Sequence, residues 1–206
     1  MAQQVFSAPY RNPPSQLRSD VRPVQSFLGL FAVLGTWPNW ERYFDLSRKG
    51  LKTSFVVLAF SLAPLWMVVY GVQSERADLL EQNLVLPNLA AYILIVGIWL
   101  FSFPALAYLM SMLFEKMDRF RPWTITRNWT VFGFSLLTGL AFVSVEVGLL
   151  PFTLANGILF AAYLGLLAAD IRLAQKVAGF NWGAAVLIGC VIVAVGMTFV
   201  QLAISR

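Results

Sequence analysis

The stretch from residue 128 to residue 169, NWTVFGFSLLTGLAFVSVEVGLLPFTLANGILFAAYLGLLAA, decides the fold of this chain. It contains two apolar runs joined by the short connection 146–151, and its only charged residue is Glu146. Each run comes close to the ~20 residues that an α-helix needs to cross the hydrocarbon core of a bilayer. Because the connection is so short, and because Pro151 suits the first position of a helix, we expect a tight antiparallel hairpin of two membrane-spanning helices.

Apolar runs of similar length continue this pattern on both sides of the hairpin. Hydrophobic residues make up 59% of the 206 residues and charged residues 12%, whereas soluble domains have roughly 45–50% and 25%. The sequence therefore predicts an all-α, polytopic membrane protein whose five transmembrane helices form one domain, 54–206. The predicted spans are 54–72, 88–114, 128–145, 152–169 and 182–204.

Positive charges gather in alternate gaps between these runs. Lys and Arg number 7 in residues 1–53, 4 in 115–127 and 2 in 170–181, against 1, 0 and 1 in the other three gaps. Because cytoplasmic loops retain Lys and Arg, we expect the richer gaps and the N-terminus to be cytoplasmic. The lack of histidine and the apolar loops suit a bacterial inner-membrane protein, which would put the C-terminus in the periplasm. Since the cations adjoin membrane spans, their expected partners are lipid headgroups and not nucleic acid.

The segment before the first span divides into two parts. Residues 1–23 are rich in Gln, Ser, Arg and Pro, and this composition predicts a disordered cytoplasmic tail. Residues 24–53 mix aromatic and cationic side chains, which is typical of an amphipathic segment lying in the headgroup layer. A docking surface for a cytoplasmic partner is the alternative. The residues expected at the interface are Trp37, Trp40, Arg42, Arg48 and Lys49.

Missing residue types exclude several classes of chemistry. The chain has no histidine and a single cysteine, Cys190. Histidine-ligated cofactors, histidine-bearing metal sites and Ser-His-Asp catalysis therefore cannot be built on this chain alone, and one cysteine cannot form an internal disulfide. We expect a protein that is not an enzyme, with no catalytic, cofactor-binding or metal-binding residues.

Two prolines inside predicted spans form a candidate hinge. Pro64 lies about ten residues from the cytoplasmic start of the first span, and Pro104 about ten from the cytoplasmic end of the second. Each removes a backbone hydrogen bond and bends its helix, so bends at matched depth would open a pocket or a hinge. The plainer alternative is that transmembrane helices tolerate proline without any functional role.

Polar residues near the outer ends of the last three spans form a candidate cluster. Glu146, Asn156 and Gln201 are expected at similar depth, and ionisable groups at membrane depth are associated with function. A solute or proton site is one interpretation, and hydrogen bonding between helices is the other. Asp170 and Arg172, by contrast, are interpreted as an ordinary exit of a helix into the cytoplasm.

Small residues recur at spacings that allow helices to approach closely. They would serve packing within the chain or within an oligomer equally well. The pairs are Ser135 with Gly139, Ala161 with Gly165, and Gly189 with Gly196.

The layout of residues 37–204, an amphipathic lead-in, five spans and a very short exit, resembles that of the Yip1-like family. The Asp-Leu-Tyr-Gly-Pro signature of its eukaryotic members is absent, so no functional residue is carried over. The resemblance implies a non-catalytic protein that acts through membrane or protein partners.

Two functions follow as hypotheses. The first is an accessory or scaffold subunit that binds another membrane protein or a second copy of itself, because the spans contain little polar chemistry. The alternative is a small transporter or channel-like protein for a solute, lipid or proton, built on the candidate hinge and the polar cluster.

Overall fold

The structure is a computed structural model that describes residues 23–35 and 39–204, and every regular element in these ranges is helical. Trp37 and residues 1–22 of the predicted tail lie outside the described residues. The elements are α1 (Pro23–Leu34), the 3₁₀ helix η1 (Trp40–Tyr43), α2 (Arg48–Phe60), α3 (Leu62–Leu79), α4 (Leu89–Leu113), α5 (Met117–Glu146), α6 (Phe152–Lys176) and α7 (Trp182–Ile204).

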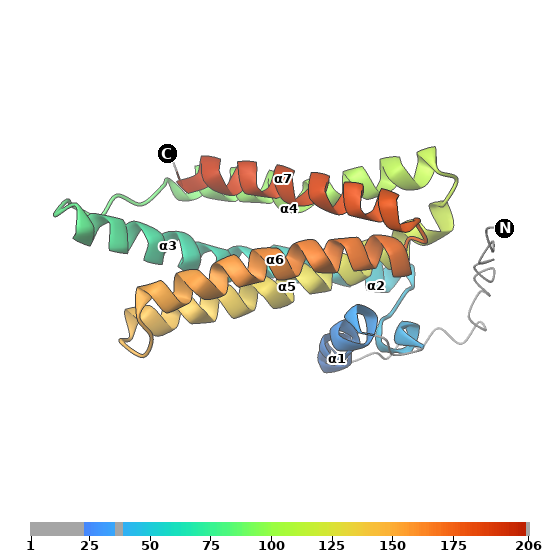
Figure 1. Ribbon diagram of the computed structural model, residues 1–206, viewed down its shortest axis with the longest axis horizontal. Helices are drawn as coiled ribbons and strands as arrows, with labels where there is room; N and C mark the ends of the chain where they lie inside the picture. The colour runs from blue at the N-terminus through green and yellow to red at the C-terminus, as the bar shows by residue number, and fades with distance from the viewer. Residues whose placement is uncertain (1–22, 36–38, 205–206) are drawn as a thin grey trace.

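The long helices run side by side in an elongated bundle of two layers. In Figure 1, α4 and α7 form one layer and α3, α5 and α6 form the other, while α2 continues the line of α3. We call the end at which α4 joins α5 and α6 joins α7 the basic end. The opposite end, at which α3 joins α4 and α5 joins α6, is the acidic end. The predicted hairpin is present as α5 and α6, which pack against each other along the bundle.

The membrane class predicted from composition is confirmed in its general form. Four helical segments of the described chain are long and apolar enough to cross a membrane, and two shorter apolar helices accompany them. The long segments are Arg48–Leu79, Leu89–Leu113, Met117–Glu146 and Phe152–Lys176, and the shorter ones are Val24–Leu34 and Trp182–Gly196. The count of five spans and their orientation stay predictions.

The first apolar helix begins earlier than predicted, at Arg48 and not at residue 54. The Ser47 hydroxyl accepts hydrogen bonds from the backbone N–H groups of Lys49 and Gly50, and this N-cap starts the helix ahead of the apolar run. Ser61 then separates α2 from α3. Because Pro64 has no N–H to donate to the carbonyl four residues earlier, the helix is interrupted just before it.

The matched depth expected of the two prolines is not found. The Tyr92 hydroxyl of α4 donates to the Leu62 carbonyl at 2.6 Å, and Phe55 of α2 stacks on Phe101 of α4 with ring centroids 5.8 Å apart. In this antiparallel register Pro64 and Pro104 lie on opposite sides of the Phe55–Phe101 contact. At 1.5 Å per residue they are roughly 15–20 Å apart along the bundle axis.

Two of the glycines in the predicted pairs, Gly139 and Gly189, make close contacts between helices. A Cβ atom on Gly139 of α5 would lie 2.5 Å from the Pro64 Cβ and 2.7 Å from its Cα. A Cβ on Gly189 of α7 would lie 2.5 Å from Ile171 of α6. Both contacts are within the chain, so internal packing accounts for these two glycines.

The Gly139 contact gives a test of the packing between α3 and α5. Gly139→Ala is expected to lower stability by about 1–3 kcal/mol, the usual range for overpacking, because backbone atoms of Pro64 would have to shift. Gly157→Ala is the matched control, since nothing lies within 4 Å of its added Cβ. Thermal unfolding of both purified variants in mild detergent measures the difference. Equal melting temperatures would contradict the close approach.

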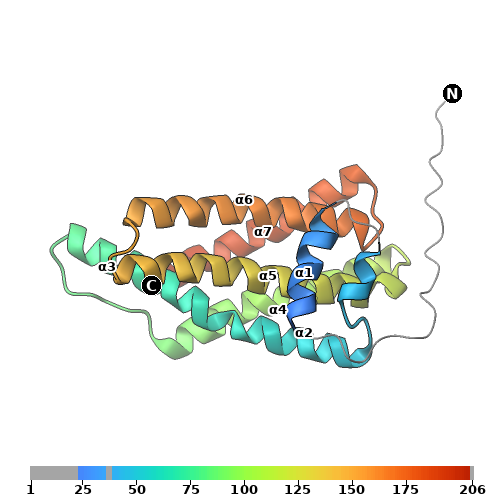
Figure 2. The same cartoon turned by 90° about the horizontal axis from the view of Figure 1, so that it is seen from below.

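The segment before α2 packs on the side of the bundle near its basic end. Figure 2 shows α1 lying across α5 and α6. The Lys176 ammonium donates to the carbonyls of Ala32 at 3.0 Å and Gly35 at 2.9 Å, so a cation caps the C-terminus of α1, where the helix dipole favours it.

The interfacial residues separate into two groups in the structure. Arg42, Arg48 and Lys49 are exposed, as an interfacial position requires. The prediction that Trp40 lies at the interface is wrong. Only 5% of Trp40 is exposed, and its ring packs against the buried Phe44 instead of facing headgroups. The tryptophan belongs to the protein core because α1 and η1 fold back on each other.

Candidate functional site

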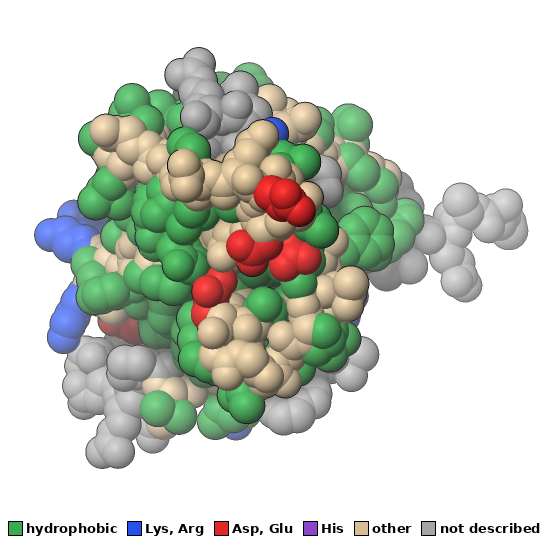
Figure 3. Space-filling model, turned by 90° about the vertical axis from the view of Figure 1, so that its left-hand side faces the viewer, with side chains coloured by type: hydrophobic (Ala, Val, Ile, Leu, Met, Phe, Trp, Pro, Cys, Tyr) green, Lys and Arg blue, Asp and Glu red, His purple; other side chains and the backbone are tan. Residues whose placement is uncertain are grey.

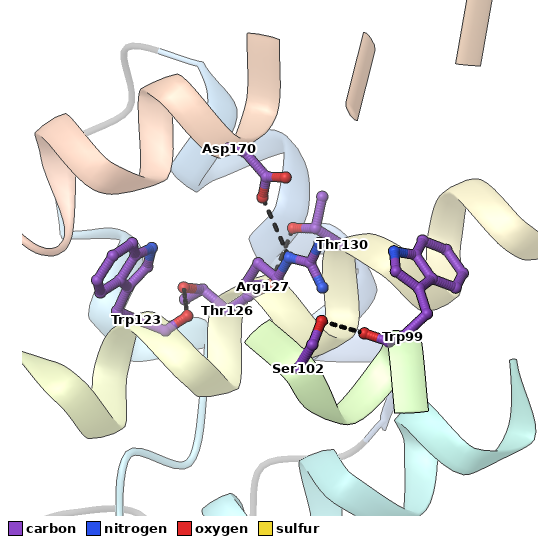
Figure 4. A network of polar contacts seen from close by, with 7 residues as sticks. All are labelled: Trp99, Ser102, Trp123, Thr126, Arg127, Thr130 and Asp170. Carbon is purple, nitrogen blue, oxygen red and sulfur yellow. Dashed lines mark hydrogen bonds and ion pairs between the residues drawn. The ribbon is translucent and has the colours of Figure 1, made fainter. Parts of the chain in front are cut away.

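A buried ion pair joins α5 to α6. Arg127 Nε lies 3.2 Å from Asp170 Oδ1, and the two side chains are 2% and 0% exposed. The hairpin itself creates this contact, because Arg127 lies 19 residues before Glu146 and Asp170 lies 19 residues after Pro151. Residues equally distant from the turn face each other in an antiparallel pair, and Figure 4 shows the guanidinium and the carboxylate pointing toward one another.

The hydrogen-bonding capacity of this pair is only partly used. Nε makes the only hydrogen bond that Arg127 forms with the described residues, although a guanidinium carries five N–H donors. Asp170 Oδ2 is buried with no hydrogen-bond partner in the part of the chain that the structure describes. The guanidinium also lies over the Phe103 ring, 4.3 Å from its centroid. Unpaired groups of this kind are costly in a protein interior, so the site is suited to hold a further polar molecule.

Several polar groups near the pair are hydrogen-bonded to backbone atoms or to each other, whereas Asn128 Oδ1 and Trp123 Nε1 are buried without a partner among the described residues. The hydroxyls of Thr126 and Thr130 donate to carbonyls one turn earlier on α5, at 2.9 Å in each case. The Asn128 amide donates to the Ser54 hydroxyl at 3.1 Å. These bonds leave Arg127 and Asp170 as the charged groups to which a ligand would bind.

A small cavity adjoins the ion pair. It has room for about one water molecule and is lined by side chains of four helices, α4 to α7. These include Trp99, which flanks the pair in Figure 4, together with Arg127, Tyr163, Leu166, Asp170 and Ile192.

A second cavity continues from the first toward the acidic end. Trp99, Tyr163 and Leu166 line both, so they form the partition between them. The second cavity is a mostly apolar cleft, and its lining includes half-buried residues such as Leu65 and Leu159. A charged pocket and an apolar cleft thus lie next to each other along the bundle, separated by Trp99, Tyr163 and Leu166.

Aromatic rings close the other side of the pocket. Phe103 packs against Trp123 at 5.3 Å between ring centroids, and Trp123 packs against Phe180 at 5.6 Å. Phe114 covers Phe180 from the end of α4, again at 5.3 Å. This aromatic cluster lies between Arg127 and the basic end, on the side of the ion pair opposite the apolar cleft.

The two ends of the bundle differ in charge. Of the eleven described Lys and Arg residues, ten belong to the basic end and only Arg76 to the acidic end. Figure 3 shows acidic side chains gathered on the acidic end. The acidic residues there are Glu75, Asp78, Glu81 and Glu146. The fold thus brings the predicted cytoplasmic gaps to one end and the predicted outer gaps to the other.

The predicted polar cluster is placed differently from the ion pair. Glu146 ends α5, Asn156 lies in the first turns of α6 and Gln201 in the last turns of α7, and all three are exposed. No hydrogen bond or ion pair joins them among the residues that the structure describes. A polar cluster of these three residues facing the outer leaflet therefore stays a prediction.

Sequence reasoning missed Arg127 and Asp170. Asp170 was interpreted as an ordinary helix exit and Arg127 as one of several loop cations, whereas both helices continue past them to Met117 and Lys176. The signal that would have found them is their equal distance from the turn of the hairpin. The described ranges contain no group of three or more acidic or cysteine residues that could hold a metal ion.

Comparisons with known proteins used protein-family models, curated proteins and solved structures. None of the three gave a match. The resemblance to the Yip1-like family therefore stays a hypothesis based on layout alone.

Proposed function

We propose that this chain is a five-span membrane protein of the transport class, with a ligand site at Arg127 and Asp170. In this proposal the N-terminus and the basic end face the cytoplasm, and the acidic end faces the outside. The protein binds a small ligand inside the bundle and moves it along the cleft. No covalent chemistry on the ligand is required.

One observation carries the proposal: the Arg127–Asp170 pair is buried beside a cavity with part of its hydrogen-bonding capacity unused. A pair that served only to hold α5 and α6 together would gain most from full mutual hydrogen bonding. Ionisable side chains inside membrane bundles are rare, and they typically mark the paths of ligands or ions.

The choice between this site and the polar cluster can be tested by substituting two carboxylates on the same hairpin. Purified protein in proteoliposomes is assayed for proton flux with an internal pH dye and for lipid translocation with fluorescent lipids quenched from outside. We expect Asp170→Asn to reduce the protein-dependent flux at least tenfold, because the amide no longer balances the Arg127 charge. Glu146→Gln is expected to leave flux unchanged, since Glu146 is exposed and has no partner among the described residues.

Several results would contradict the proposal. Wild-type protein that carries neither probe above the background of empty vesicles would argue against transport of these ligands. Flux that survives Asp170→Asn but fails with Glu146→Gln would favour the polar cluster instead. Both variants are first checked for wild-type elution on size exclusion, so that loss of folding is separated from loss of function.

A further inference from the structure

The charge of the pocket restricts the ligand. Arg127 and Asp170 together are neutral, and both are at most 2% exposed. A ligand that brought a net charge into this site would add an unbalanced charge in a region of low dielectric constant, which is strongly unfavourable. The pocket therefore favours a ligand group with no net charge.

The unused hydrogen-bonding positions of the ion pair restrict the chemistry of the ligand further. The remaining guanidinium N–H groups can only donate, and the ionised Oδ2 of Asp170 can only accept. A group that satisfies both must contain an acceptor and a donor close together. Hydroxyl, amide and protonated carboxyl groups have this property, whereas a ketone, an ether or a hydrocarbon does not.

The cleft beyond the pocket is suited to a hydrocarbon chain. It is lined largely by apolar side chains, among them Leu65, Val131, Phe134 and Leu159. The cleft also includes the hydroxyls of Ser135 and Thr138, but each donates to a backbone carbonyl of its own helix, at 2.9 Å for Ser135 and 3.0 Å for Thr138. The other polar side-chain atoms of the lining are the Tyr163 hydroxyl and the Trp99 indole N–H, and both residues lie where the cleft adjoins the pocket.

The depth of the site matches the orientation of a lipid in one leaflet. Arg127 and Asp170 adjoin the predicted span boundaries at residues 128 and 169, so we expect them near the headgroups of the leaflet at the basic end, and the cleft extends from them toward the middle of the bundle. A ligand from that leaflet would enter with its polar end already at the level of the ion pair.

We propose that the site takes a neutral single-chain amphiphile, with a hydroxyl, amide or protonated carboxyl head on Arg127 and Asp170 and its chain in the cleft. This inference rests on the proposed function and names the ligand class of the same site. The two cavities as they stand have room for only a few water molecules, so ligand entry requires Trp99 and Tyr163, which line both, to move apart.

Photolabelling in nanodiscs tests the ligand class. The probe is hexadecanol with a diazirine in its chain, compared with hexadecylammonium and hexadecyl sulfate that carry the same diazirine. A diazirine-bearing butanol represents a water-soluble source of the same head chemistry. We expect hexadecanol to label peptides of α5 and α6 that line the cleft at least fivefold more than either charged probe or the butanol.

Neighbouring alanines on α6 provide matched variants. Ala162 is buried and lines the cleft, whereas Ala161 is exposed on the surface of the bundle. Ala162→Leu is expected to reduce labelling of the cleft by hexadecanol at least fivefold, and Ala161→Leu to leave it within twofold of wild type.

The possible outcomes are distinguishable. Equal labelling by the charged chains, or equal loss of labelling in both leucine variants, would overturn the inference. Labelling of the cleft by butanol but not by hexadecanol would also overturn it, while leaving the proposed ligand site itself intact. The comparison of probes on wild-type protein decides the ligand class even if a leucine variant fails to fold.

Discussion

Replacing Asp170 by leucine is expected to destabilise the protein by about 3–5 kcal/mol, the usual cost of leaving one member of a buried ion pair alone. Arg127 is 2% exposed, and Asp170 accepts its only hydrogen bond to a described residue. Without the carboxylate, the guanidinium stays charged in the interior, over the Phe103 ring and with no acidic partner among the described residues. Equilibrium unfolding in mixed micelles measures the free energy of unfolding.

The double variant Arg127→Met with Asp170→Leu is the informative control. Replacing a whole buried ion pair by apolar residues of similar size is often neutral, or stabilising by about 1–4 kcal/mol. We therefore expect the double variant to be at least as stable as the wild type, although it contains the substitution that destabilises the protein alone. A double variant as unstable as the single one would mean that the two side chains are not paired in the folded protein.

Replacing Trp123 by alanine is expected to cost about 3–5 kcal/mol, as is usual for the removal of a large buried aromatic side chain. Trp123 is fully buried, and its ring packs between those of Phe103 and Phe180. The residue thus joins α4, α5 and the α6–α7 connection at the basic end. Loss of the Trp123 ring would leave a cavity about one helical turn from Arg127, toward the basic end.

Trp182 provides the control for this substitution, because it is the same residue type and 63% of it is exposed. Trp182→Ala is expected to change the free energy of unfolding by no more than about 0.5 kcal/mol. The two variants are compared by the same unfolding titration in mixed micelles. Similar losses of stability in both would contradict the placement of Trp123 in the core of the basic end.

The hairpin was the part of the fold best predicted from sequence. The two apolar runs and the short connection with Pro151 require α5 and α6 to be antiparallel neighbours, since local length and turn chemistry are sufficient for that conclusion. The close approach expected at Gly139 is also present, because the contact of this residue with Pro64 depends on the absence of a side chain. Local rules of this kind do not need the positions of distant helices.

The predictions for the two prolines and for Trp40 were wrong because these positions depend on contacts between distant segments of the chain. The relative depth of Pro64 and Pro104 depends on how α4 slides along α2 and α3, which the Tyr92–Leu62 and Phe55–Phe101 contacts set. Trp40 was assigned to the headgroups by its type and its cationic neighbours, but α1 provides it with a packing surface inside the protein. Neither register nor such folding back can be inferred from apolar runs.

The scaffold hypothesis stays a prediction. Large apolar side chains are exposed on α4 and α7, including Ile93, Ile98 and Leu187. A helix that faces lipid would expose such side chains whether or not a protein partner binds there, so these faces do not distinguish the two functions. We favour the transport class because the ion pair lies beside a cavity within the bundle and part of its hydrogen-bonding capacity is unused among the described residues.

The most direct test of the ligand site is the flux of the Arg127→Met, Asp170→Leu double variant in proteoliposomes. This variant is expected to keep the fold while removing every charged group from the pocket. We expect wild-type stability, with proton flux and lipid translocation reduced to the level of empty vesicles. A stable double variant that retains wild-type flux would contradict the proposed ligand site, because the ion pair would then be unnecessary for function.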